Sequence, residues 1–180
     1  MFSIIIPLYN KAQYILRALE SVKVQTFKEY EVLVIDDGSS DEGPNLVLEH
    51  FADSVTLIRQ MNGGVSAARN VGIAQAKYDY IAFLDADDYW HPNYLEAMSR
   101  GILAFPETGI FGSSYGFKAE DFHDNGSGFK LIEGYFEKAI HNTLLFTSAT
   151  VVKKSFFEPN RGFKPNLKRG EDLDVWFRTI

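Results

Sequence analysis

The sequence predicts an α/β fold in which helices cover both faces of a mostly parallel sheet. Three observations lead to this fold class. Short apolar runs typical of buried strands alternate with helical segments four times over roughly the first hundred residues. Such alternation is typical of right-handed βαβ units. Polar residues gather where the predicted strands end, and this is the edge at which parallel sheets bind ligands.

The first strand is predicted at residues 2–8, a β-branched run that Pro7 closes. A helix follows, because apolar residues then recur at helical spacing as far as Val22. The same reasoning places strands at 30–35, 55–58 and 80–84, and helices at 44–51, 65–76 and 93–103.

The second half of the chain is less regular. Strands are predicted at 110–117 and 144–152, a polar mobile loop at 118–128, and a loop with two prolines and two glycines at 157–170. A helix begins at Glu171 and is still running at Ile180. We therefore expect this chain to be one domain that continues in a longer protein.

Composition excludes several classes of protein. Apolar residues make up 46% of the 180 residues and charged residues 23%, the balance of a globular rather than a disordered chain. The net charge is −6 and no basic run exceeds two residues, which argues against a nucleic-acid binder. Cysteine is absent, so the chain has no disulfide or zinc–thiolate site, and this fits a reducing compartment. No apolar run has the ~18 residues of a membrane helix, and no signal peptide is recognised.

An acidic turn, Asp85-Ala86-Asp87, directly follows the predicted strand at 80–84. Two carboxylates two residues apart, where a strand opens into a turn, can converge on one hard divalent cation. The alternative is a solvated acidic turn with no ligand. The position at a strand's carboxyl end favours the metal site.

A second acidic turn, Asp36-Asp37-Gly38-Ser39, ends the strand at 30–35. One of its carboxylates could accept hydrogen bonds from a nucleobase or a ribose. Alternatively, the side chain of Ser39, Ser40 or Asp41 caps the next helix by accepting hydrogen bonds from its free backbone N–H groups. The two interpretations are compatible, because capping needs only one of these side chains.

Two further segments carry candidate site residues. The glycines of 62–70 permit close backbone approach at a helix start, and Arg69 could reach a phosphate or a base there. The alternative is a packing helix with an exposed arginine. Glu171 and Asp172 begin the last predicted helix, where acids also simply favour the helix dipole, and one of them could serve as a general base.

Taken together, these segments resemble the inverting glycosyltransferases of family 2, which have the Rossmann-like GT-A fold. The resemblance runs from Ser3 to Arg178. It rests on six motifs in order: IIIPLYN (4–10), QTF (25–27), VIDDGSSD (34–41), NGG with AARNVG (62–64 and 67–72), FLDADD (83–88), and GED (170–172) followed by Trp176 and Arg178. Each motif alone is weak, and the six in this order are specific.

The resemblance implies a role for each matching residue. Pro7 and Tyr9 would line the base pocket, and Asp37, with Asp36 beside it, would hydrogen-bond the base. Arg69 would contact the nucleotide. Asp85 and Ala86 would face the ribose or the donor sugar, and Asp87, with Asp85, would ligate Mg²⁺ or Mn²⁺. Asp172 would deprotonate the acceptor hydroxyl, with Glu171 the second choice as base.

The resemblance also implies partners and an organisation. The donor would be a UDP-sugar, and the acceptor a glycan or a lipid-linked glycan in cell-surface polysaccharide synthesis. The domain would bind nucleotide through about residues 1–105 and acceptor through about 106–180. The resemblance implies a cytoplasmic location and allows peripheral association with the inner face of a membrane. The QxxRW segment of processive members is absent, which favours single addition.

Two other classes of protein remain open at this point. A sugar-nucleotide nucleotidyltransferase would share the sheet and the cation, but it normally has a glycine-rich loop after the first strand, where this chain has Pro7-Leu8-Tyr9-Asn10-Lys11. A non-enzymatic receiver-like module would place its acidic pair after the first strand, whereas here the pair follows the second.

Overall fold

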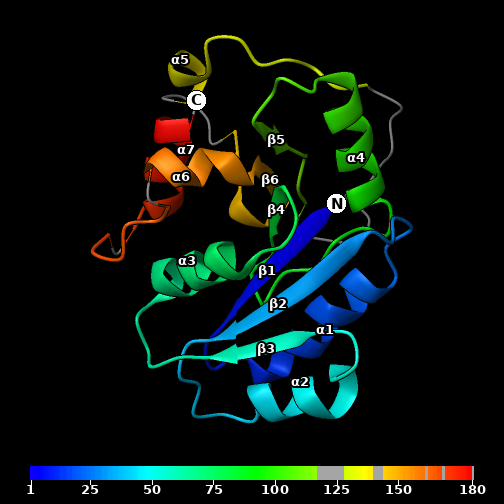
Figure 1. Cartoon of the computed structure of the whole chain (residues 1–180), viewed down its shortest axis with the longest axis vertical. Helices are drawn as coiled ribbons and strands as arrows, with labels where there is room; N and C mark the ends of the chain where they lie inside the picture. The colour runs from blue at the N-terminus through cyan, green and yellow to red at the C-terminus, as the bar shows by residue number, and fades with distance from the viewer. Residues whose placement is uncertain (117–127, 140–143, 161, 168, 180) are drawn as a thin grey trace.

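A six-stranded sheet forms the centre of the computed structural model (Figure 1). The structure describes residues 1–116, 128–139, 144–160, 162–167 and 169–179. Across the sheet the strands follow the order β3-β2-β1-β4-β6-β5. They are β1 (Phe2–Leu8), β2 (Tyr30–Asp36), β3 (Thr56–Arg59), β4 (Tyr80–Phe83), β5 (Ile110–Gly112) and β6 (Thr150–Lys153).

The sheet is parallel in its first part and antiparallel at one edge. Strand β1 pairs in parallel with both β2 and β4, and β2 pairs in parallel with β3. Strand β6 runs antiparallel to β4 and to β5. The chain thus lays β2 and β3 on one side of β1 and β4 on the other, so the carboxyl ends of β1, β2 and β4 meet at a point where the strand order reverses.

Helices cover both faces of the sheet, as the apolar runs predict. They are α1 (Ala12–Lys23), α2 (Gly43–Phe51), α3 (Val65–Gln75), α4 (Tyr94–Ala104), α5 (Tyr135–Ala139), α6 (Phe157–Asn160) and α7 (Glu171–Thr179). In one core, Ile4 and Ile6 of β1 pack with residues of α1, α2 and α4. In the other core, Ile5 packs with residues of α3 and α7, and Figure 1 shows α3 apart from α1 and α2. The α/β fold class is therefore confirmed.

Helix α3 lies unusually close to the central strand. A Cβ atom added to Gly72 would stand 2.5 Å from Cγ2 of Ile5, so a larger residue would force the two elements apart. Only glycine permits this spacing. The close packing fixes the height of α3 over β1, and with it the position of Arg69 one turn earlier in the same helix.

The strand predicted at 144–152 is shorter than expected. Only Thr150–Lys153 forms β6, and Thr147–Ala149 forms a single 3-10 turn. The turn has other partners than a neighbouring strand: the Ser148 hydroxyl accepts the N–H of Asp85 at 3.0 Å, and its carbonyl accepts the Trp90 indole N–H at 2.5 Å. The apolar pattern of this stretch therefore reflects burial beneath the exit of β4.

The remaining differences concern the second half of the chain. Strand β5 ends at Gly112 rather than 117, and residue 117 with most of the predicted loop 118–128 lies outside the described residues. The loop predicted at 157–170 begins with the short helix α6, because the ring of Phe157 packs edge-on against Phe83 with 6.1 Å between centroids. No helix within the described ranges is long and apolar enough to cross a membrane.

Candidate active site

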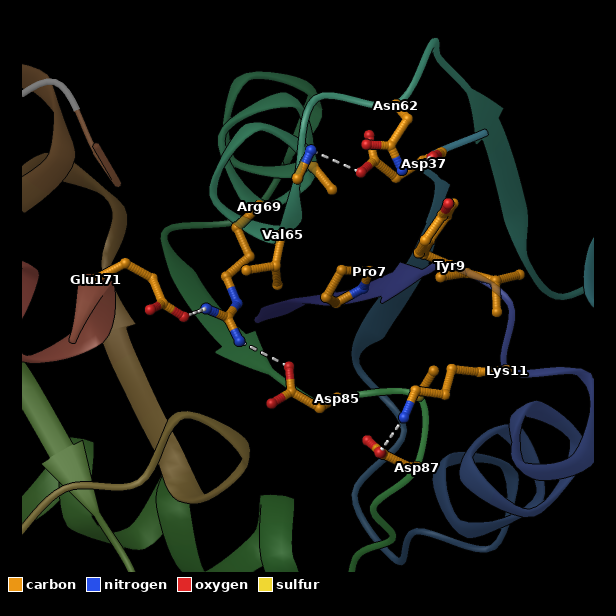
Figure 2. Close-up of a pocket in the computed structure, with 14 residues that line it drawn as sticks. Pro7, Tyr9, Lys11, Asp37, Asn62, Val65, Arg69, Asp85, Asp87 and Glu171 are labelled. Atoms are coloured by element: carbon orange, nitrogen blue, oxygen red, sulfur yellow. Dashed lines mark hydrogen bonds and ion pairs between the residues drawn. The ribbon is translucent and has the colours of Figure 1, made fainter. Parts of the chain in front are cut away.

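A cavity of about 460 Å³ opens at the carboxyl ends of β1, β2 and β4, where the strand order reverses (Figure 2). Its volume lies in the range of small-ligand sites. Helix α3 and the start of α7 complete its wall. The sequence-predicted residues that line it are Pro7, Tyr9, Asp37, Arg69, Asp85, Ala86, Asp87 and Glu171. The fold therefore brings together residues from motifs far apart in the chain.

Asp37 organises the loop between β3 and α3. Its side chain is 2% exposed. One carboxylate oxygen accepts the N–H of Gly63 at 2.8 Å and the Gln60 side-chain amide at 2.7 Å, and the other accepts the N–H of Gly64 at 2.8 Å. Gly64 has a φ of 85°, which a residue with a side chain rarely adopts. Asp37 thus holds the glycine turn against the cavity.

Asp36 and Asp41, the acids before and after Asp37 in the second acidic turn, accept hydrogen bonds from different backbone groups. Asp36 is buried, and its Oδ1 accepts the N–H of Ser39 at 2.9 Å. Asp41 accepts the N–H of Ala12, the first residue of α1, at 2.8 Å, and the N–H of Gly43, the first residue of α2, at 3.0 Å. Asp41 therefore satisfies two helix starts, as the capping interpretation expects, while Asp37 lines the cavity and its contact with a nucleotide stays a prediction.

Arg69 is a buried ion-pair residue rather than an exposed arginine on a packing helix. It is 3% exposed. Its Nη2 donates to Oδ1 of Asp85 at 2.8 Å and its Nη1 donates to Oε1 of Glu171 at 3.2 Å (Figure 2). The guanidinium also lies 5.1 Å from the ring centroid of Phe163. One side chain thus joins α3, the exit of β4 and the start of α7.

The first acidic turn carries two carboxylates with different partners. Asp85 pairs with Arg69, and its backbone N–H donates to Ser148. Asp87 pairs instead with Lys11, whose Nζ lies 2.6 Å from Oδ2, and the Asp87 carbonyl accepts a hydrogen bond from Arg17 at 2.6 Å. The hydrogen bond to Asp87 raises the pKa of Lys11 above its ordinary value. Ala86 between the two acids is buried.

Asp85 and Asp87 fit a divalent cation only as part of a shared site. Among the described residues no three His, Cys, Asp or Glu side chains gather closely enough to hold a metal ion by themselves. Mg²⁺, however, is usually bound in proteins by one or two carboxylates plus substrate phosphates. Both carboxylates line the same cavity, so these residues fit a cation that a phosphate ligand helps to hold.

The two acids at the start of α7 face different surroundings. Glu171 lines the cavity and contacts Arg69. Asp172 accepts the Thr147 hydroxyl at 3.3 Å on one oxygen and the N–H of Leu173 at 2.8 Å on the other. Asp172 is not one of the described residues that line the cavity. The fully buried Trp176 anchors the helix that carries both acids.

Some cavity residues have no counterpart among the predictions. Lys11, Asn62 and Val65 also line it. Lys11 directly follows the motif at 4–10, so its position in the sequence was a usable signal. Asn62 lies within a quoted motif, and its side-chain amide donates to the carbonyl of Asp37 at 3.0 Å. Among the predicted residues, Tyr9 lines the cavity and is 49% exposed.

Comparison with known proteins identifies the family of the chain. The family model described as "Glycosyl transferase family 2" matches residues 3–160, most of the chain. The chain belongs to glycosyltransferase family 2. One relative in this family is the glycosyltransferase GlyA of Streptococcus pneumoniae serotype 4, which is 31% identical over 162 residues. That match covers 86% of this chain and 22% of GlyA, and the chain spans between 22% and 35% of the first four curated relatives.

Solved structures confirm the GT-A fold. S. aureus TarS (residues 1–349) superimposes with a TM-score of 0.77 at 24% identity, covering 99% of this chain and 54% of TarS. Its complex with UDP-GlcNAc gives a TM-score of 0.74 at 25% identity. The mannosyltransferase PcManGT of Pyrobaculum calidifontis, solved with GDP-Man and Mn²⁺, gives 0.73 at 20% identity over 97% of this chain and 51% of its own.

Proposed function

We propose that this domain transfers a sugar from a nucleoside-diphosphate donor, a UDP-sugar, to an acceptor hydroxyl with inversion and with the help of Mn²⁺ or Mg²⁺. The observation that carries the proposal is the single cavity lined by Asp37, Arg69, Asp85, Asp87 and Glu171. We place the activity in cell-surface polysaccharide or glycan synthesis, in the cytoplasm, with a glycan or lipid-linked acceptor. In this proposal residues 1–105 serve the donor and 106–180 the acceptor.

The nucleotide would occupy the part of the cavity between β1 and the β3–α3 loop. Pro7 and Tyr9 offer a flat apolar surface to a base, and Tyr9 is exposed enough to move over it. Oδ1 of Asp37 already accepts two hydrogen bonds and Oδ2 accepts one, so Oδ2 keeps one lone pair that could accept a base N–H. Asp36 supports the turn from behind.

The donor diphosphate and sugar would lie along the exit of β4. Asp85 and Ala86 face this part, and Arg69 holds Asp85 in place. Asp87, with Asp85, would hold the cation. When bound, that cation stabilises the negative charge that develops on the leaving diphosphate.

Inversion requires a proton acceptor on the far side of the sugar from the diphosphate. Helix α7 begins with two acids, of which Glu171 lines the cavity and Asp172 is its neighbour in the chain. We assign the role to Asp172, because the Glu171 carboxylate is already engaged by the buried Arg69, whereas among the described residues Asp172 accepts hydrogen bonds from the Thr147 hydroxyl and the N–H of Leu173. Glu171 is the alternative base and the residue to test beside it.

The relatives support the class of donor. TarS has been solved in complex with UDP and with UDP-GlcNAc, and PcManGT with GDP-Man and Mn²⁺. All three ligands are nucleoside diphosphates or their sugars. We prefer UDP because the likeness at 25% identity is to the UDP-GlcNAc complex, whereas PcManGT is 20% identical.

Calorimetry of the purified protein with UDP, GDP and uridine tests the proposal, each in Mn²⁺ and in EDTA. We expect UDP to bind, and to bind more tightly with Mn²⁺. If GDP bound and UDP did not, the proposed donor would change from a UDP-sugar to a GDP-sugar, and the proposed reaction would stand. If no nucleoside diphosphate bound under either condition, the proposal would be wrong. A receiver-like module, unlike a glycosyltransferase, would give no heat with UDP.

A further inference from the structure

Lys11 and Asp87 form an ion pair inside the cavity, next to the proposed donor site. The Lys11 ammonium lies 2.6 Å from Oδ2 of Asp87, and the two side chains are 40% and 43% exposed. Figure 2 shows Lys11 reaching from the start of α1 to meet Asp87 beyond the end of β4. Both residues line the cavity, so the pair borders the space that a ligand would fill.

The backbone on both sides of this pair is fixed. Asn10, just before Lys11, adopts a φ of 51° and is held by Ser39, whose hydroxyl accepts its N–H at 3.1 Å, and by the N–H of Ser40, which donates to its side chain at 2.8 Å. On the other side, Arg17 donates to the Asp87 carbonyl at 2.6 Å. The contact between Lys11 and Asp87 is therefore made from backbone segments that hydrogen bonds hold in place.

The Lys11 ammonium occupies a carboxylate oxygen that a metal ion would need as a ligand. Oδ2 of Asp87 is one of the oxygens that a divalent cation in this cavity would use, and Lys11 already donates to it. A cation and an ammonium cannot share one carboxylate oxygen at contact distance without strong repulsion. Lys11 must therefore leave Asp87 when the site is loaded.

We propose that Lys11 is a resident cation of the donor site: it holds Asp87 in the empty cavity and turns to the donor diphosphate when the nucleotide enters, which leaves Asp87 to a divalent cation. The proposal rests on the function proposed above. A lysine ammonium is a compact charge on a flexible stem, which suits such a move and suits phosphate oxygens. The ammonium also lies over the ring of Tyr14, with Nζ 5.6 Å from its centroid, and this cation–π contact keeps the residue at the cavity after release.

This arrangement predicts two effects of opposite sign for Lys11→Met. Methionine keeps an apolar stem of similar length and removes the charge. Without its competitor, Asp87 should bind Mn²⁺ about two- to fivefold more tightly, the factor for a partly exposed ion pair. Without the ammonium, UDP in EDTA should bind about three- to tenfold more weakly. If Lys11 had only a structural role, its replacement would not raise the affinity for Mn²⁺ and lower the affinity for UDP.

The measurements need no turnover. Electron paramagnetic resonance counts free Mn²⁺ during titration of the nucleotide-free protein up to millimolar Mn²⁺, because two carboxylates without a phosphate bind the ion weakly. Calorimetry gives UDP and uridine affinities in EDTA. Lys23→Met is the matched control: Lys23 lies at the far end of α1, 63% exposed and paired with Glu20. Lys11→Arg keeps the charge, so its metal-free UDP affinity should stay near that of the parent, and thermal melting checks that each variant folds.

The outcomes separate this inference from the proposed function. If the parent binds UDP more tightly with Mn²⁺ but Lys11→Met changes neither Mn²⁺ nor UDP affinity beyond Lys23→Met, the role of Lys11 is wrong and the proposed function stands. If Lys11→Met lowers Mn²⁺ affinity, the competition is refuted. If the parent binds no UDP, the proposed function and the diphosphate contact both fail, and the Mn²⁺ titration still decides the competition for Asp87.

Discussion

Arg69 donates a hydrogen bond at 3.2 Å to Glu171, a residue 102 positions later in the chain. The same guanidinium contacts Asp85 at 2.8 Å and is almost wholly shielded from water. The proposed donor side and the proposed acceptor side of the cavity therefore meet at one buried charge. Because a buried cation needs both carboxylates, a change to any of the three is felt by the others.

The first prediction concerns this ion-pair cluster. Arg69→Met leaves Glu171 without its cation, and we expect the free energy of unfolding to fall by about 1–3 kcal/mol. Glu171→Gln should cost less once Arg69 is absent, so a double-mutant cycle in urea should give a coupling energy of about 0.5–3 kcal/mol. Arg100→Met, an exposed change on α4, is the control. Additive effects of the two changes would contradict the coupling.

The second prediction concerns the metal. Asp87→Ala should remove most of the gain in UDP affinity that Mn²⁺ gives over EDTA, because Asp87 is the proposed ligand. The fold should survive, since the side chain is 43% exposed. Calorimetry in both conditions measures the gain, and thermal melting checks the fold. If UDP already binds the parent equally well in EDTA, Asp87 has no metal to hold.

The third prediction concerns the glycine turn and the base. Asp37→Ala should weaken uridine and UDP by the same factor, equivalent to about 1–3 kcal/mol, because the lost partner touches the base and not the phosphate. It should also lower the free energy of unfolding, since the N–H groups of Gly63 and Gly64 lose their acceptor. The exposed Asp53→Ala is the control. Unchanged uridine affinity would rule out the contact with the base.

The fourth prediction concerns catalysis. Asp172→Asn keeps the shape and removes the basicity, and we expect turnover to fall about 10²–10⁴-fold while UDP affinity barely changes. Glu171→Gln should cost less turnover. The assay should use the longest natural form of the protein, because acceptor contacts can lie outside these residues. Turnover of Asp172→Asn within about threefold of the parent would exclude Asp172, and Glu171 would then be the base to examine.

The fifth prediction concerns pH and stability at the other end of the sheet. Burial raises the pKa of Glu31, but hydrogen bonds from Ser3 and Lys77 outweigh it and hold this pKa below its ordinary value of 4.5. A pKa lowered by folding stabilises the native state above the ordinary pKa, and this contribution disappears as pH falls through the lowered value.

Glu31→Gln should therefore lower the free energy of unfolding by about 1–3 kcal/mol at neutral pH. The gap to the parent should narrow as pH falls below the ordinary pKa of 4.5 and through the lowered native pKa, where the Glu31 carboxyl takes up its proton. Urea titrations across this range measure the gap. The exposed Glu107→Gln is the control. A gap that stays constant with pH would contradict the lowered pKa.

Much of the fold could be predicted because the first half of the chain is locally consistent. Each predicted strand and helix between residues 2 and 103 has a counterpart in the structure, with bounds that differ by a residue or two. There, burial on both faces produces continuous apolar runs that match the sheet. At 144–152 the same kind of run was misleading, because the segment is buried beneath Trp90 and Asp85 before it reaches its partner strands.

The candidate site was predictable as a list of residues but not as a set of contacts. Motif order places Asp37 and Asp85 at strand ends and Arg69 in the first turns of a helix. The order of the motifs does not predict that Arg69 is buried between two carboxylates, or that Asp87 pairs with Lys11. Those pairings depend on side-chain direction and on the height of α3 over β1, which Gly72 sets and which no periodicity in the sequence encodes.

The first strand of the chain is also the inner strand of the parallel sheet, and this constrains which pieces of the protein can exist alone. β1 is held on one side by β2 and on the other by β4, which begins only at Tyr80. A fragment ending before Tyr80 would keep one edge of β1 open, with the wholly apolar stretch from Ile4 to Ile6 along it. Open edges of this kind recruit other chains. Shortened versions that stop there should precipitate, whereas those that include β4 close the edge.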